Sequence, residues 1–197
     1  MTLPKLPYHE YTDERLLEAL PKGEVPAFDE LYRRYSKRLL HYFQRMLGGD
    51  RAKAQDFLQE IFLKIIEKPH LFQAHQRFST WRYAIAHNMC KNEYRRLRVR
   101  SRSTREGGMN GVPPAATHDA LPETLVMQEE LLAQVWQALA ECEEVQRSTF
   151  LLRFQQELSI KEISAILSCS EGTTKSRLFY TLKKLAKSLQ EFNPNKS

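Results

Sequence analysis

The chain lacks long apolar runs and has few cysteines. No segment approaches the roughly 20 apolar residues that cross a bilayer, and the opening stretch MTLPKLPYHEYTDER lacks the apolar centre of a secretion signal. The three cysteines, Cys90, Cys142 and Cys169, show no CxxC spacing. We therefore expect reduced thiols in a cytoplasmic protein.

Motifs for catalysis are also absent. The sequence contains no GxxxxGK[ST] phosphate-binding loop and no GxSxG nucleophile elbow. His87 and Cys90 lie three residues apart, but two ligands do not make a zinc site. We expect a protein that is not an enzyme and that needs no metal and no cofactor.

Charge is unevenly distributed along the chain. Residues 76–105 carry 9 Lys and Arg against 1 Glu, whereas residues 106–145 carry 8 Asp and Glu and no Lys or Arg. Residues 146–190 are basic again, with 8 Lys and Arg against 3 Glu. Basic segments attract polyanions, and phosphate contacts supply most of the non-specific affinity for nucleic acid. A basic run can equally be a solvated helix face, so charge alone leaves both interpretations open.

Apolar residues recur at helical spacing throughout, without a convincing strand pattern. Segment 101–122 interrupts this pattern with three of the seven glycines and three of the nine prolines. We predict an all-α protein with two small helical domains at residues 10–100 and 123–190, joined by a flexible linker over residues 101–122.

The stretch LSIKEISAILSCSEGTTKSRLFYTLKKL, residues 158–185, predicts a helical hairpin. Ser159 and Glu162 have the spacing of a capping box, and Ser170 is placed to cap the second helix. One face of this second helix is predicted to point inward, namely Thr174, Leu178, Leu182, Leu185 and Leu189. The outward face offers Thr173, Lys175, Ser176, Arg177, Phe179 and Tyr180. A helix-turn-helix uses such an outer face to contact base edges and phosphates, although an ordinary hairpin with a solvated basic face fits as well.

This stretch resembles the C-terminal helix-turn-helix of extracytoplasmic-function sigma factors, a group within the sigma-70 family. Their pattern is close to LSxxEIAxxLxxSxGTVKSRLxxAxxxL. The resemblance implies that the outward side chains read the −35 promoter element. The same pattern overlaps LuxR-type transcription factors, so this half leaves two families open.

The first half resembles sigma region 2. In AQDFLQEIFLKIIEK the family pattern D-L-x-Q-E-x-F is matched by Asp56, Gln59, Glu60 and Phe62. The resemblance implies that these residues dock on the clamp helices of the RNA polymerase β′ subunit. An amphipathic helix with carboxylates and amides beside an apolar anchor suits such a helix-on-helix interface.

The segment FSTWRYAIAHNMCKNEYRRLRVR resembles the family's promoter-melting segment. Its departures are Asn92, where Asp is frequent, and Arg82, where Leu is usual. The resemblance implies that −10 DNA is contacted by Phe78, Trp81, Asn88, Asn92, Arg95 and Arg96. Trp81 could instead be only a core anchor.

Together the two halves imply an alternative sigma factor that binds core RNA polymerase and directs promoter-specific initiation. The implied partners are the β′ clamp helices and the β flap of the polymerase, promoter DNA and an anti-sigma factor. The implied location is the bacterial cytoplasm, where an anti-sigma factor could hold the chain at the membrane. The alternative is a LuxR-like regulator that binds its operator without polymerase.

Overall fold

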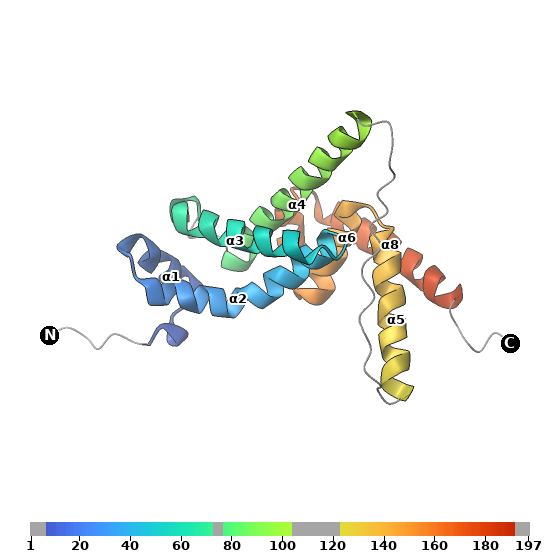
Figure 1. The fold of residues 1–197 in the computed structure, drawn as a ribbon, viewed down its shortest axis with the longest axis horizontal. Helices are drawn as coiled ribbons and strands as arrows, with labels where there is room; N and C mark the ends of the chain where they lie inside the picture. Colours follow the sequence, from blue (N-terminus) through green and yellow to red (C-terminus); the bar gives the residue numbers. More distant parts are fainter. Residues whose placement is uncertain (1–6, 73–76, 104–122, 192–197) are drawn as a thin grey trace.

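The computed structural model describes residues 7–72, 77–103 and 123–191, and these form helices and turns without a strand (Figure 1). The α-helices are α1 (Asp13–Ala19), α2 (Val25–Met46), α3 (Arg51–Glu67), α4 (Phe78–Ser103), α5 (Glu123–Ala140), α6 (Glu144–Phe150), α7 (Ile160–Ile166) and α8 (Glu171–Glu191). The prediction of an all-α fold is confirmed. None of the described helices is long and apolar enough to cross a membrane.

Helix starts carry hydrogen-bonded caps, among them the two at Ser159 and Ser170 that were predicted from the sequence. The Thr12 side chain accepts a backbone N–H at the start of α1. Ser159 and Glu162 form the reciprocal capping box at the start of α7. Ser170 Oγ accepts the N–H of Thr173 at 3.1 Å at the start of α8. These caps satisfy N–H groups that have no partner within the helix.

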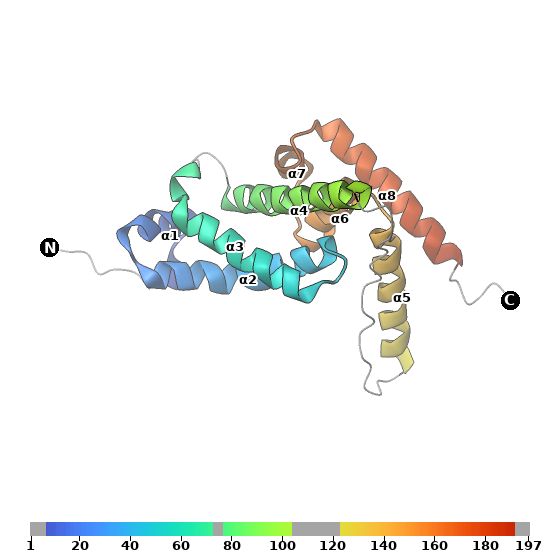
Figure 2. The same cartoon turned by 45° about the horizontal axis from the view of Figure 1, so that its top comes forward.

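Helices α1 to α4 build the first half around an apolar core. Leu31, Tyr42 and Phe43 of α2 meet Ile61 and Ile65 of α3, and each of these side chains is at most 1% exposed. Burial of such a side chain contributes about 1.5–3 kcal/mol. The pairing of α2 with α3, visible in Figure 2, therefore sets the position of α3 and of its outer face.

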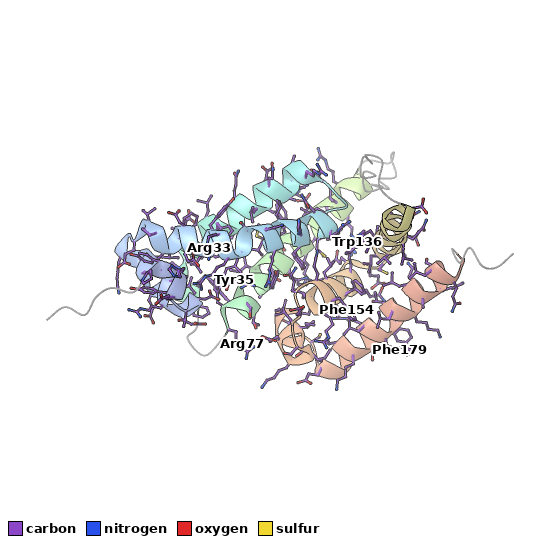
Figure 3. The ribbon with its side chains drawn as sticks, turned by 90° about the horizontal axis from the view of Figure 1, so that it is seen from below. Arg33, Tyr35, Arg77, Trp136, Phe154 and Phe179 are labelled. Carbon is purple, nitrogen blue, oxygen red and sulfur yellow. The ribbon has the colours of Figure 1, made fainter. Side chains whose placement is uncertain are left out.

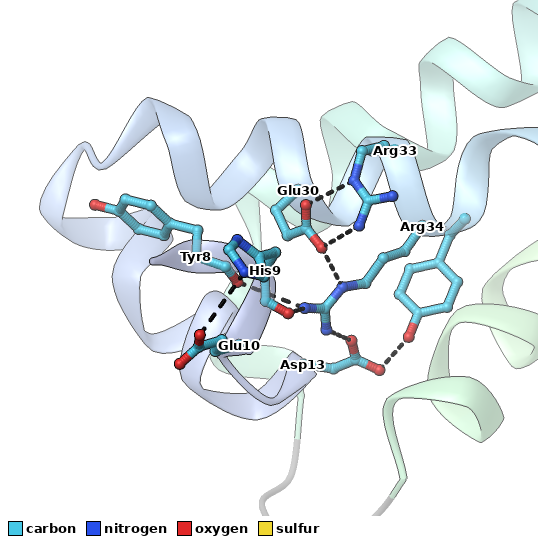
Figure 4. A network of polar contacts seen from close by, with 8 residues as sticks. Tyr8, His9, Glu10, Asp13, Glu30, Arg33 and Arg34 are labelled. Atoms are coloured by element: carbon cyan, nitrogen blue, oxygen red, sulfur yellow. Dashed lines mark hydrogen bonds and ion pairs between the residues drawn. The ribbon is translucent and has the colours of Figure 1, made fainter. Parts of the chain in front are cut away.

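A polar network fixes α1 on α2 (Figure 4). Arg34 donates to Asp13 at 2.9 Å and to Glu30 at 2.6 Å, and Arg33 donates to Glu30 at 2.7 Å. The hydrogen bond from Arg33 is the main reason why the pKa of Glu30 falls to about 2, and Arg34 adds to it against the effect of burial. The Tyr35 hydroxyl completes the network by donating to Asp13.

Helices α5 to α8 form the second half, in which α7 and α8 make the predicted hairpin. The buried side of α8 consists of Thr174, Leu178, Thr181 and Leu185, each at most 8% exposed. The prediction that Leu182 points inward is wrong, because its side chain is 43% exposed. A helix of 3.6 residues per turn that buries residues 174 and 178 next returns to the same side at residue 181.

The two halves lie against each other rather than apart (Figures 1 and 2). Helix α4 packs on α6 and α7, and apolar side chains of the second half join the core of the first half. The Arg45 guanidinium of α2 also lies over the Trp136 ring of α5, 3.7 Å from its centroid. Helix α4 continues to Ser103, three residues into the predicted linker. Residues 104–122 lie outside the described residues, so their flexibility stays a prediction.

Candidate functional site

Helix α3 presents a polar face to solvent. Asp56, Gln59 and Glu60 are exposed, and Lys64 forms an ion pair with Glu60 one turn away. The helix is capped by Asp50, whose carboxylate accepts the N–H of residue 53 at 3.0 Å. Three of the four residues predicted for polymerase binding therefore share an accessible face on a rigid helix.

The fourth residue, Phe62, lies beneath this face. It is 3% exposed and packs against the rings of Phe28 and Tyr32, with centroids 5.8 and 4.8 Å away. Leu63 is instead the exposed apolar side chain beside Gln59 and Glu60, with 55% of its surface accessible. Leu63 lies four and three residues after these two positions, which is the neighbour spacing on a helix. This spacing is a signal in the sequence that could have identified Leu63.

The predicted −10 residues on α4 divide into two groups. Asn88, Asn92, Arg95 and Arg96 are exposed and follow one another along a single stripe of the helix. Arg96 forms an ion pair with Glu93 at 3.0 Å, which holds the guanidinium at the edge of that stripe. Amide and guanidinium groups on one accessible stripe provide donors and acceptors for both bases and phosphates.

The aromatic residues of the −10 group lie inside the protein. Phe78 is 1% exposed and Trp81 is 9% exposed, and their rings pack together with a centroid separation of 5.9 Å. Phe72 covers Trp81 at 5.5 Å. In this structure both side chains are core residues, which for Trp81 is the alternative that the sequence left open.

The unusual residue Arg82 is also buried, with 4% of its surface exposed. Its guanidinium stacks 3.8 Å above the Tyr35 ring and 4.9 Å from the Tyr83 ring. Nε and Nη1 of Arg82 have no hydrogen-bond partner among the described residues. Cation–π contact with aromatic rings explains how an arginine occupies a position where the family pattern has leucine.

The predicted −35 residues lie on the first turns of α8. The exposed members are Thr173, Lys175, Ser176, Phe179 and Tyr180. Arg177 differs from them, because it is half-buried and its Nη1 lies 3.3 Å from the Sγ of Cys169 in the turn before α8. The outer face of the first turns of α8 is thus polar and aromatic, and Lys175 is its exposed cation.

Comparison with known families adds two matches along the chain. The family described as Sigma-70 region 2 matches residues 31–100. The family described as Sigma-70, region 4 matches residues 132–185. The first match contains α3 and the exposed stripe of α4, and the second contains the hairpin of α7 and α8.

Curated relatives extend over most of the chain. The RNA polymerase sigma-H factor of Pseudomonas aeruginosa is 30% identical over 185 residues, covering 90% of this chain and 94% of that protein. The ECF RNA polymerase sigma-E factor of Escherichia coli K12 is 31% identical over 185 residues, covering 85% and 89%.

Two solved structures share the fold. The sigma factor RpoE of Bartonella quintana, in complex with the anti-sigma factor NepR, has a TM-score of 0.68 at 21% identity and covers 83% of this chain and 96% of its own. CnrH, in complex with the cytosolic domain of CnrY, has a TM-score of 0.65 at 18% identity and covers 91% and 97%.

Proposed function

The chain belongs to the extracytoplasmic-function group of the sigma-70 family and is an alternative sigma factor that directs transcription initiation; from this premise we propose which surfaces carry each step. Both matched regions are sigma-70 regions, which leaves the LuxR-like alternative without support. Sigma factors regulate transcription and are not known as enzymes. The residue assignments and domain limits that follow are our proposals.

Helix α3 docks on core RNA polymerase, at the clamp helices of the β′ subunit. Asp56, Gln59 and Glu60 supply the polar contacts, and Leu63 supplies the apolar anchor in place of Phe62. A helix face on which the exposed apolar side chains of Leu63 and Ile66 lie beside carboxylates and an amide fits the groove between two partner helices. The second half makes the other polymerase contact, at the β flap.

The exposed stripe of α4 contacts the −10 element after the duplex has opened. Unpaired bases present their Watson–Crick edges, and the amides of Asn88 and Asn92 can donate to and accept from them. Arg95 and Arg96 hold the phosphates of the separated strand. The accessibility of all four side chains on one helix is the observation that carries this assignment.

Helix α8 reads the −35 element as duplex DNA. Its first turns enter the major groove, where Lys175 and Ser176 reach base edges and Tyr180 packs beside them. Arg177 must leave its contact with Cys169 to join them. Phe179 and Thr173 complete the contact surface.

An anti-sigma factor is the expected inhibitor. The sigma factors in the two similar structures were solved in complex with NepR and with the cytosolic domain of CnrY. We infer a comparable partner for this chain and place the chain in the cytoplasm, where polymerase and promoter DNA are found. The inhibitor could hold the chain at the membrane.

Two substitutions test the division between duplex reading and melting. Lys175→Ala should weaken initiation on a duplex promoter by the roughly 1–3 kcal/mol of a lost base contact, a factor of about 5–150. It should have little effect on a template with a mismatched bubble at −10 and no −35 element. Asn88→Ala should reduce transcription from both templates, because the base that Asn88 contacts is unpaired in each of them once the duplex promoter has opened.

The matched control is Lys37→Ala, which removes one exposed charge from α2 away from both reading surfaces. It should behave like the parent on both templates. An equal defect of Lys175→Ala on the duplex and bubble templates would contradict the assignment of α8 to −35.

A further inference from the structure

A buried carboxylate lies within the DNA-facing stretch of α4. Glu93 is only 7% exposed, whereas Asn92, Arg95 and Arg96 around it are exposed. Acidic side chains are almost never fully buried unless they are paired. The −10 contact proposed above gives Glu93 no role, so its burial needs another explanation.

Two cations from two helices hold this carboxylate. Arg96, three residues further along α4, donates from Nη2 to Oε1 of Glu93 at 3.0 Å, and its Nε lies 3.0 Å from Oε2. Lys53 of α3 also donates to Oε1. Helices α3 and α4 lie side by side in Figures 2 and 3. Glu93 therefore ties an arginine of the −10 group to the neighbouring helix.

The Glu93 carboxyl remains ionised in this contact. Burial by itself would raise the pKa of this carboxyl, but hydrogen bonds from Arg96 and Lys53, together with their charges, lower it below its ordinary value. Hydrogen bonds between ionised groups are stronger than those between neutral ones. Two contacts between one guanidinium and one carboxylate fix the plane of the guanidinium as well as its position.

The contact leaves one end of the Arg96 guanidinium free. A guanidinium carries N–H donors on all three of its nitrogens. Glu93 engages Nε and Nη2, and Nη1 has no partner within the described residues. The Arg96 side chain is 65% exposed. A phosphate can therefore approach the donors that Glu93 does not use.

The support for this arrangement is rigid. Lys53 lies in the first turn of α3, where Asp50 caps its backbone N–H, and its side chain is only 27% exposed. Arg95, the other arginine assigned to phosphates, contacts no other side chain in the described part of the protein. Arg96 is thus held in one orientation, whereas Arg95 is not.

We propose that Glu93 is a positioning residue for the −10 contact: together with Lys53 it holds Arg96 in the orientation that binds a phosphate of the opened strand. A long exposed side chain loses rotamer freedom when it binds, and this loss weakens binding. An arginine that is already held in the bound orientation avoids most of this loss. The inference rests on the sigma-factor function and the −10 assignment proposed above.

Simple charge repulsion predicts the opposite effect of Glu93. A carboxylate beside the DNA repels phosphates, so removal of its charge alone should strengthen binding. If Glu93 positions Arg96, removal of the charge should weaken binding instead. The sign of the change therefore separates the two explanations.

The test measures binding of the full chain with core polymerase to a template that has a mismatched bubble at −10 and no −35 element. Glu93→Gln keeps the shape of the side chain and removes its charge. We expect about two- to tenfold weaker binding, the range for ordering one long side chain. Glu18→Gln, which removes an exposed carboxylate from α1, is the matched control and should bind like the parent.

A second variant separates positioning from a general loss of structure. Arg96→Lys keeps the charge of this exposed residue but cannot contact both carboxylate oxygens in one plane. It should weaken binding by a similar factor. The double variant should bind no more weakly than the weaker single variant, because both changes remove the same arrangement. Independent structural damage would make the two factors multiply.

Each result bears on the proposal. Unchanged or tighter binding by Glu93→Gln, parent-like binding by Arg96→Lys, or multiplied losses in the double variant would overturn it. Run-off transcription by the parent chain on a duplex promoter tests the underlying function separately. Absence of a promoter-dependent transcript there would overturn the sigma-factor function itself.

Discussion

Arg147 is a buried cation that joins the ends of several helices. It is 8% exposed and lies where α2, α4, α5 and α6 meet. Its guanidinium donates to the backbone oxygens of Met46 (3.2 Å), Leu139 (2.9 Å), Ala140 and Cys142 (3.2 Å) and to the Tyr94 hydroxyl (2.8 Å). Met46 ends α2, Leu139 and Ala140 end α5, and Cys142 lies in the turn that follows α5. Carbonyls in the last turn of a helix have no N–H partner further along that helix.

Arg147→Met keeps much of the side-chain volume and removes every one of these donors. A hydrogen bond to a charged group contributes about 1.5–3 kcal/mol, but bonds from one guanidinium do not add, and the freed carbonyls gain some water. We therefore expect the free energy of unfolding to fall by about 3–5 kcal/mol, the range for breaking a buried charged network. Against a total stability of about 5–15 kcal/mol this is a large fraction.

Urea denaturation followed by circular dichroism measures this change. Arg153→Met is the matched control, because the exposed Arg153 makes one hydrogen bond within the described part of the chain, to the backbone oxygen of Leu158 at 3.0 Å. It should cost about 1 kcal/mol or less. An Arg147→Met chain within about 1 kcal/mol of the parent would refute the view that this guanidinium holds the helix ends together.

Two further predictions follow from burial. Phe62→Ala should lower the free energy of unfolding by about 3–5 kcal/mol. Leu63→Ala should leave this free energy nearly unchanged and should weaken co-purification with core polymerase. Nearly unchanged stability and weakened co-purification for Phe62→Ala, with lowered stability for Leu63→Ala, would place the anchor on Phe62. Lowering the pH from 7.5 to 5 should reduce the free energy of unfolding by about 2 kcal/mol through His87. Burial, then the charges of Lys91 and Arg177, hold its pKa at about 4 in the folded chain against an ordinary 6.5. This contribution is fully present above pH 6.5 and is lost as the pH falls toward 4. Between pH 7.5 and 5, the urea midpoint of unfolding should change less steeply with pH in His87→Gln than in the parent chain. An equally steep change in both would contradict the assignment of this effect to His87.

Helix positions and caps could be predicted from the sequence, because they depend on local chemistry. Ser159 and Glu162 bond to each other across one turn, whatever packs around them. The exposed stripes of α4 and α8 follow from periodicity in the same way. Thr181 takes the buried place that was predicted for Leu182, and its Oγ1 donates to the backbone oxygen of Arg177 at 2.7 Å within its own helix. A hydroxyl satisfied in this way is buried at little cost.

The packing of one half on the other could not be predicted from the sequence. Periodicity shows which face of a helix is apolar, but it does not show what covers that face. Phe62 lies on the apolar face of α3, but only the structure shows that the rings of Phe28 and Tyr32 from α2 cover it. Arg82 is buried for a similar reason, since the Tyr35 ring that accepts its charge comes from a distant part of the chain.

The most direct test of the sigma-factor assignment is run-off transcription from linear duplex promoters with purified core RNA polymerase. Core enzyme alone should give no specific transcript, and addition of the chain should give one start site per recognised promoter. Asp56→Lys with Glu60→Lys should abolish this transcript while the circular dichroism spectrum stays that of the parent. Tight binding of the chain alone to promoter duplex, with no gain of promoter specificity by the polymerase, would contradict the sigma-factor assignment.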